Sequence, residues 1–136
     1  GEVKEYNKIY HEQIDKIKKE TGRNISLYPI MSQEGATSDQ IQDIINKIHN
    51  CSICFADVTT NNANVSYEMG WARALKKSVI LVLRKGTEKP KSDYQNDTYH
   101  EYDDTCRSVS LGEVIHDNII KVLKDNYSLE SNEKNE

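Results

Sequence analysis

The spacing of apolar residues predicts a helix at the start of the chain and a strand after it. Within residues 3–20, apolar side chains recur at steps of three and four along one helical face, at Val3, Tyr6, Tyr10, Ile14 and Ile17. Gly22 is expected to end this helix. Residues 24–30 alternate between apolar and polar side chains, which predicts a short strand. Pro29 lacks an amide hydrogen for a central ladder, so we expect this strand near a sheet edge.

Two longer apolar runs predict buried strands. Residues 51–58 and 78–83 are almost continuously apolar, as in parallel strands that are covered on both faces. The other expected elements are helices over 37–49, from Asn62 or Asn64 to Lys77, and from Ser110 to about 123, with a short strand over 99–102. This alternation predicts an α/β fold of the flavodoxin/Rossmann-like kind, a parallel sheet with helices on both faces. We expect one domain over residues 1–126 and a disordered tail over 127–136.

Composition narrows the class of protein. The chain has 136 residues, of which 36% are apolar, and this is enough for one domain with one core. Its net charge of -4 argues against binding to nucleic acid or to anionic membranes. No apolar run approaches the roughly 20 residues that span a bilayer. The three cysteines form an odd set that fits a reducing, cytoplasmic location.

Two of the cysteines, Cys51 and Cys54, have the C-x-x-C spacing of metal and redox sites. There is no second such pair, and the four histidines are scattered along the chain. Apolar filling of a buried strand is therefore the favoured interpretation, and no metal is expected.

The stretch over residues 56–83 carries the candidate chemistry. Its strand ends in Asp57, and Glu68 lies in the early turns of the following helix, so we expect both near the ligand-binding edge of the sheet. The positive helix N-terminus favours an ionised Glu68. Such a carboxylate suits a nucleophile, or a group that stabilises positive charge at a sugar anomeric carbon. Asp57 could hold ribose hydroxyls. Gly70 and Ala72 are expected to let the helix approach the sheet closely.

Each candidate residue also has a purely structural interpretation. Glu68 could be a helix-terminus carboxylate, and Asp57 could cap the turn after its strand. Asn62 and Asn64 are candidate ligand contacts, although caps and turn residues of this kind are commoner. The last candidates are Trp71, which could stack on a base or pack in the core, and Ser32, which follows the strand over 24–30. Eight tyrosines against one phenylalanine indicate an interface or a pocket rim.

The string ADVTTNNANVSYEMGWARAL, followed three residues later by VILV, resembles the signature of nucleoside 2-deoxyribosyltransferase-like proteins, whose fold is similar to that of TIR domains. The resemblance implies that Glu68 is the catalytic carboxylate, which acts at C1′ as an N-glycosidic bond breaks. It also implies that Asp57 belongs to the ligand edge. Asn62 stands where characterised transferases have an acidic residue that helps to protonate the base, and it cannot supply a proton. The family's first strand is missing ahead of the opening helix, so either it lies outside this sequence or another segment takes its place.

We therefore expect an N-glycosidase-type enzyme, either deoxyribosyltransferase-like or NAD(P) nucleosidase-like. It would cleave or exchange the base–ribose bond of a nucleoside, a nucleotide or an NAD-like dinucleotide. No cofactor is expected, with NAD considered only as a substrate. The alternative is a non-catalytic, TIR-like nucleotide-binding or sensor module, for which the resemblance implies a role in bacterial anti-phage defence. The resemblance also leaves homo-oligomer formation open.

Overall fold

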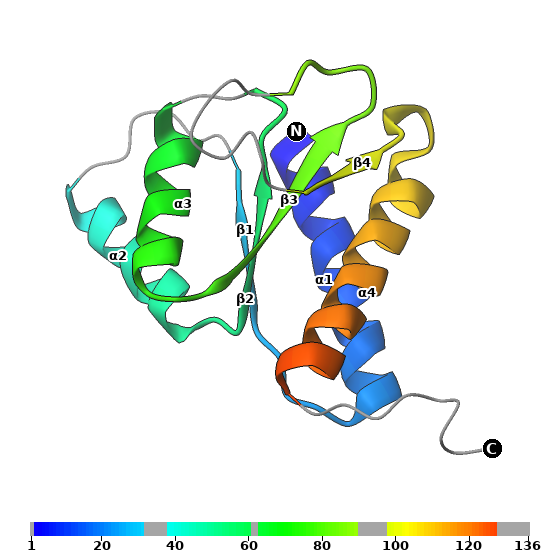
Figure 1. Cartoon of the computed structure of the whole chain (residues 1–136), viewed down its shortest axis with the longest axis horizontal. Helices are drawn as coiled ribbons and strands as arrows, with labels where there is room; N and C mark the ends of the chain where they lie inside the picture. The colour runs from blue at the N-terminus through cyan, green and yellow to red at the C-terminus, as the bar shows by residue number, and fades with distance from the viewer. Residues whose placement is uncertain (1, 32–37, 61–62, 90–97, 128–136) are drawn as a thin grey trace.

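The protein is a parallel β-sheet between two layers of helices (Figure 1). The structure is a computed structural model, and it describes residues 2–31, 38–60, 63–89 and 98–127. The helices are α1 (Glu2–Thr21), α2 (Ser38–Asn50), α3 (Ala63–Ala74) and α4 (Arg107–Asn126), with a short 3₁₀ turn η1 (Asp104–Cys106). The strands are β1 (Leu27–Ile30), β2 (Ile53–Asp57), β3 (Ser78–Arg84) and β4 (Tyr99–Tyr102). Within the described ranges, no helix is long and apolar enough to cross a membrane.

The strands follow the order β1-β2-β3-β4, and every neighbouring pair is parallel. This confirms the expected α/β fold. β1 forms its ladder directly with β2, so that Leu27 lies opposite Ile53. Among the described residues, no strand lies between β1 and β2.

Pro29 lies on the free side of β1. The Ser26 carbonyl accepts hydrogen bonds from the Ser52 and Ile53 amides at 2.8 and 3.3 Å, so Ser26 faces β2. Backbone groups alternate sides along a strand, and odd-numbered positions of β1 therefore point away from β2. The Pro29 nitrogen points outward, where its missing hydrogen costs no ladder bond and blunts the open edge. The edge position expected from Pro29 is confirmed.

Strand β2 divides the core into two parts. Ile53 and Phe55 pack with buried residues of α1 and α4, whereas Cys54 and Ala56 pack with buried residues of α2 and α3. All four side chains are inaccessible to solvent. The continuous apolar run therefore reflects burial on both faces, as the sequence predicts.

Several predicted boundaries shift by a few residues. α1 ends as expected, with Gly22 at a φ of +69° and its amide bonded to the Lys18 carbonyl. α4 begins at Arg107 rather than at Ser110. The Ser110 hydroxyl accepts from the Asp103 amide at 2.8 Å, so it supports the turn that precedes the helix. α3 ends at Ala74, three residues earlier than predicted.

The expectation for Gly70 is wrong, because a Cβ added there would meet nothing within 4 Å. Gly70 is exposed and does not face the sheet. Ala72 is fully buried on the α3 face that meets the sheet, as expected. The close approach predicted for a glycine lies in α4 instead, where a Cβ on Gly112 would come within 2.8 Å of the Gln13 side chain of α1.

The core assignment predicts how truncations affect stability. Ile115 is fully buried in the core between α1, α4 and the sheet, so Ile115→Ala should lower the free energy of unfolding by about 2–5 kcal/mol. Val109 lies on the same helix but is 66% exposed, and Val109→Ala should change it by less than about 0.5 kcal/mol. Urea denaturation measures both, and equal losses for the two variants would contradict the assignment.

Candidate functional site

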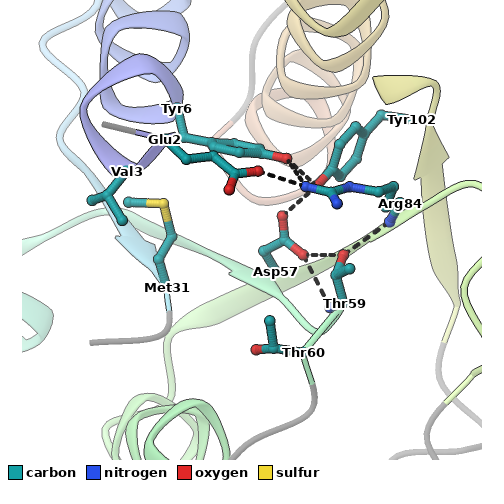
Figure 2. Close-up of a pocket in the computed structure, with 9 residues that line it drawn as sticks. All are labelled: Glu2, Val3, Tyr6, Met31, Asp57, Thr59, Thr60, Arg84 and Tyr102. Carbon is teal, nitrogen blue, oxygen red and sulfur yellow. Dashed lines mark hydrogen bonds and ion pairs between the residues drawn. The ribbon is translucent and has the colours of Figure 1, made fainter. Parts of the chain in front are cut away.

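A cavity of about 250 Å³ opens at the carboxyl edge of the sheet (Figure 2). Each strand contributes to it: Met31 follows β1, Asp57 ends β2, Arg84 ends β3 and Tyr102 ends β4. The start of α1 closes one side with Glu2, Val3 and Tyr6. Ligands of open α/β sheets bind at this edge, so the cavity occupies the expected place.

Asp57 is held at the floor of the cavity by two neighbours. Its Oδ1 accepts hydrogen bonds from the backbone amide of Thr59, at 3.0 Å, and from the Thr59 hydroxyl. Its Oδ2 accepts from the Tyr102 hydroxyl at 2.7 Å. The first pair confirms that Asp57 caps the turn after its strand. Asp57 also lines the cavity, and a contact between its carboxylate and a ligand there is a proposal.

A chain of hydrogen bonds crosses the cavity from Arg84 to Asp57 (Figure 2). Arg84 donates to the Tyr6 hydroxyl at 2.9 Å, and the Tyr6 and Tyr102 hydroxyls are 2.8 Å apart. Tyr102 in turn donates to Asp57, so each hydroxyl in this series can accept from the residue before it and donate to the residue after it. Burial and the Asp57 hydrogen bond raise the pKa of Tyr102 well above its usual range, which keeps the hydroxyl protonated as a donor.

The charge of the cavity is mixed. Arg84 also donates to Glu2 Oε1 at 2.8 Å and forms a longer ion pair with Asp104 at 3.6 Å. Hydrogen bonding to Tyr6 raises the pKa of Arg84, so this guanidinium stays charged. The carboxylates of Glu2 and Asp57 therefore share the cavity with a cation that already has partners.

Glu68 is buried inside the fold. Of the polar and charged side chains in the described part of the chain, Glu68 alone is buried, with 6% of its surface exposed. Its Oε1 accepts a hydrogen bond from the Tyr28 hydroxyl of β1 at 2.9 Å. Burial raises the pKa of Glu68, and the bond from Tyr28 opposes that rise. No described cation contributes to the pKa.

These surroundings differ from those expected for Glu68. It is the sixth residue of α3, past the first turn in which the positive helix end is felt. Burial, rather than the helix terminus, dominates its environment, so the neutral form is favoured more than the sequence suggests.

Asp57 and Glu68 lie on opposite faces of the sheet. Asp57 continues the row of Ile53 and Phe55 and faces α1 and α4. Glu68 lies on α3 among the core residues that cover the other face, and its partner Tyr28 packs against that same core. The two carboxylates therefore have different hydrogen-bond partners, although the sequence places both near the same edge of the sheet.

The remaining predicted residues are placed as follows. Asn64 is the second residue of α3 and is half-buried, which makes it a first-turn residue rather than the cap. Trp71 is half-buried and packs against the core between α3 and the sheet, in line with its packing interpretation. Ser32 and Asn62 lie outside the described residues. No described histidine, cysteine, aspartate or glutamate belongs to a group of three suited to hold a metal.

Several residues that contact Asp57 or Glu68, or that line the cavity, are not among the site residues predicted from the sequence. Tyr6 and Tyr28 were assigned only to a helix stripe and a strand, yet their hydroxyls contact Tyr102 and Glu68. The excess of tyrosine over phenylalanine was the available signal, because a hydroxyl is kept where a buried polar partner needs one. Arg84 opens a basic cluster with Lys85, Lys89 and Lys91 that could cover a phosphate, but the acidic and amide residues interleaved with it favour a solvated loop.

The hydrogen-bond chain predicts a cost for removing one hydroxyl. Tyr102→Phe should lower the free energy of unfolding by about 1–3 kcal/mol, because Asp57 and Tyr6 both lose a partner. Tyr67→Phe is the matched control, since Tyr67 is 65% exposed, and it should have little effect. Thermal and urea unfolding measure both variants. A Tyr102→Phe variant as stable as the control would show that the hydrogen bonds of the Tyr102 hydroxyl do not stabilise the fold.

The raised pKa of Glu68 predicts a specific dependence of stability on pH. The folded state holds the Glu68 proton more tightly than the unfolded state does, where the ordinary value is 4.5. The stability that Glu68 contributes is therefore complete below 4.5 and is lost as the pH rises through its folded-state pKa. Glu68→Gln removes this titration, so the variant should gain stability relative to the parent as the pH rises.

Urea denaturation of both proteins, at a series of pH values from below 4.5 upward, measures the difference in unfolding free energy. Glu113→Gln, on the exposed side of α4, is the control. Its unfolding free energy should not rise relative to that of the parent as the pH rises. A difference between Glu68→Gln and the parent that is constant with pH would show that Glu68 has no raised pKa.

Comparison with known proteins agrees with this architecture. No family model matches the chain, and no curated protein sequence matches it. Among solved structures, Clostridium botulinum CMP N-glycosidase, BcmB, matches with a TM-score of 0.51 and 18% identity, over 83% of this chain and 91% of that chain. At this identity the match shows a shared fold. The fold implied by the resemblance to nucleoside 2-deoxyribosyltransferase-like proteins is thus confirmed by a solved structure similar to this chain.

Proposed function

We propose that this protein is an N-glycosidase-type enzyme that acts on the base–ribose bond of a nucleotide or nucleoside, with Glu68 as its catalytic carboxylate. One observation carries the proposal, namely the burial of Glu68 without a described cation beside it. Burying a carboxylate in this way costs stability, and groups with shifted pKa values concentrate at functional sites. The N-glycosidase fold that the chain resembles supports the class of reaction.

Glu68 would act when it is ionised. As the bond between C1′ and the base nitrogen lengthens, positive charge develops at C1′, and a carboxylate beside that carbon stabilises it or bonds to it. The departing base keeps the bonding electron pair and takes up one proton, and the water or second base that then bonds to C1′ gives up one proton, so the exchange balances. The Tyr28 hydroxyl bonded to Glu68 would hold the carboxylate in one orientation and favour its charged form against the effect of burial.

The cavity at the carboxyl edge would bind the rest of the substrate. Asp57 accepts hydrogen bonds and suits the hydroxyls of a ribose. Glu68 is not among the described residues that line this cavity, so a substrate bound there would have to extend past the ends of β1 and β2 to meet it. The solved structure similar to this chain is named for CMP, which makes pyrimidine nucleotides the first substrates to test, followed by NAD.

A second function is a nucleotide-binding or sensor module without chemistry. The placement of Asp57 and Glu68 on opposite faces of the sheet favours it, because an active site needs its groups around one substrate. The asparagine at position 62, where an acid helps base departure in characterised transferases, favours it as well. Such a module would bind the nucleotide and release no base.

Glu68→Gln separates catalysis from binding. The change preserves size and an acceptor for Tyr28 but removes the charge, so base release should fall by at least about 100-fold. Incubation with CMP, cytidine and NAD, followed by chromatography for free cytosine and nicotinamide, measures the rate. Binding of the same compounds, measured by calorimetry, should stay within a few fold of the parent.

Glu113→Gln is the matched control, because its side chain is exposed on α4. Base release that is unchanged in Glu68→Gln would reject the catalytic assignment. Binding by the parent with no base release from any of these compounds would favour the sensor module.

A further inference from the structure

A pair of cysteine thiols lies where α2 passes into β2. Cys51 follows the last residue of α2, and Cys54 is the second residue of β2. Their sulfur atoms are 3.4 Å apart. The Cys51 thiol donates to the Ile48 carbonyl at 3.2 Å, which leaves its sulfur free to accept from the Cys54 thiol. The two sulfurs therefore already face each other in the folded protein.

The surroundings favour the thiolate of Cys51. The hydrogen bond from Cys54 lowers the pKa of Cys51 to about 7, with help from the charge of Lys77 and against the effect of burial. The Lys77 ammonium is held beside this site by a 2.9 Å hydrogen bond to the Cys51 carbonyl. The same pairing and burial raise the pKa of Cys54 well above its usual range. One member thus resembles an attacking thiolate and the other a protonated partner, the division of roles found in redox-active pairs.

Small molecules can approach Cys51 from one side. A groove of about 360 Å³ runs between β1 and the end of α2, and Tyr28, Asp43, Lys47 and Cys51 are among the residues that line it. Cys51 is 6% exposed, whereas Cys54 is fully buried behind it. An oxidant that enters the groove would therefore meet Cys51 first.

We propose that Cys51 and Cys54 form a reversible redox site, in which a peroxide converts the two thiols into an intrachain disulfide. The Cys51 thiolate attacks one oxygen of hydrogen peroxide, the O–O bond breaks, and Cys51 becomes a sulfenic acid while hydroxide leaves. The Cys54 sulfur then attacks the Cys51 sulfur, loses its proton and expels a second hydroxide. In total, two thiols and one peroxide give one disulfide and two waters. This proposal does not rest on the function proposed for Glu68.

The disulfide requires only a local movement. The sulfurs must approach from 3.4 Å to about 2.05 Å, and Cys51 lies in the short connection between α2 and β2, so the change is confined to that segment. We therefore expect oxidation to leave the sheet intact, and a dithiol reductant to reverse it.

The experiment uses the full chain with Cys106→Ser, because Cys106 is exposed and would otherwise react with peroxide on its own. After treatment of the native protein with hydrogen peroxide, intact-mass spectrometry should show the loss of two hydrogen atoms, and peptide mapping should join Cys51 to Cys54. Dithiothreitol should restore the original mass. Circular dichroism should keep its native shape and a cooperative melting transition.

The single variants Cys51→Ser and Cys54→Ser, in the same background, test the assigned roles. Cys54→Ser should leave a sulfenic acid at Cys51 that dimedone traps, while Cys51→Ser should react much more slowly. The proposal is overturned if the native protein resists oxidation under conditions that oxidise its urea-unfolded form. It is also overturned if the disulfide appears only together with loss of the cooperative transition, or if Cys54 reacts as fast without Cys51 as Cys51 does without Cys54.

Discussion

Strand β2 is buried on both faces, and its two-residue alternation separates the chemistry of this protein into two halves. Odd-numbered positions face α1 and α4, and they end in Asp57 with its bonds to Thr59 and Tyr102. Even-numbered positions face α2 and α3, where Cys54 shares a core with the helix that carries Glu68. A shift of the pairing register by one residue would exchange these sets, so the identity of both polar centres depends on the register of β1, β2 and β3.

The buried carboxylate is the costly element in this arrangement. By contrast, Arg107 pairs with the exposed carboxylates of Glu2 and Glu5, both at 3.2 Å, and these ion pairs anchor the start of α1 near the cavity. Glu68 instead has a phenol for a partner, which can donate one hydrogen bond but cannot balance a charge. A residue that lowers stability in its ionised form is expected where function requires the charge. This contrast is the reason for assigning chemistry to Glu68 rather than to the exposed acidic residues.

Periodicity was sufficient to predict most of the fold. The long apolar stripes and the runs over 51–58 and 78–83 specify helices and buried strands through burial alone, and the short strand Tyr99–Tyr102 was found at its true bounds. Helix ends were less accurate, because α4 begins with a turn built on Asp103 and Ser110 that no apolar pattern records. The partners of Asp57 and Glu68 could not be predicted, since Tyr102 and Tyr28 reach them only after distant strands have paired. The alternation along the strand places Asp57 on the same face as Ile53 and Phe55. The sequence does not say which helices cover that face.

The titration of Glu68 itself shows directly whether its buried carboxylate lacks a balancing charge. Its side-chain carboxyl carbon can be followed by NMR as the pH is raised, with the Glu68→Gln protein identifying the signal. We expect a midpoint above the ordinary value of 4.5, because burial outweighs the hydrogen bond from Tyr28. A midpoint at or below 4.5 would mean that the carboxylate is solvated or paired with a cation, and would contradict the unbalanced burial from which its functional role is inferred.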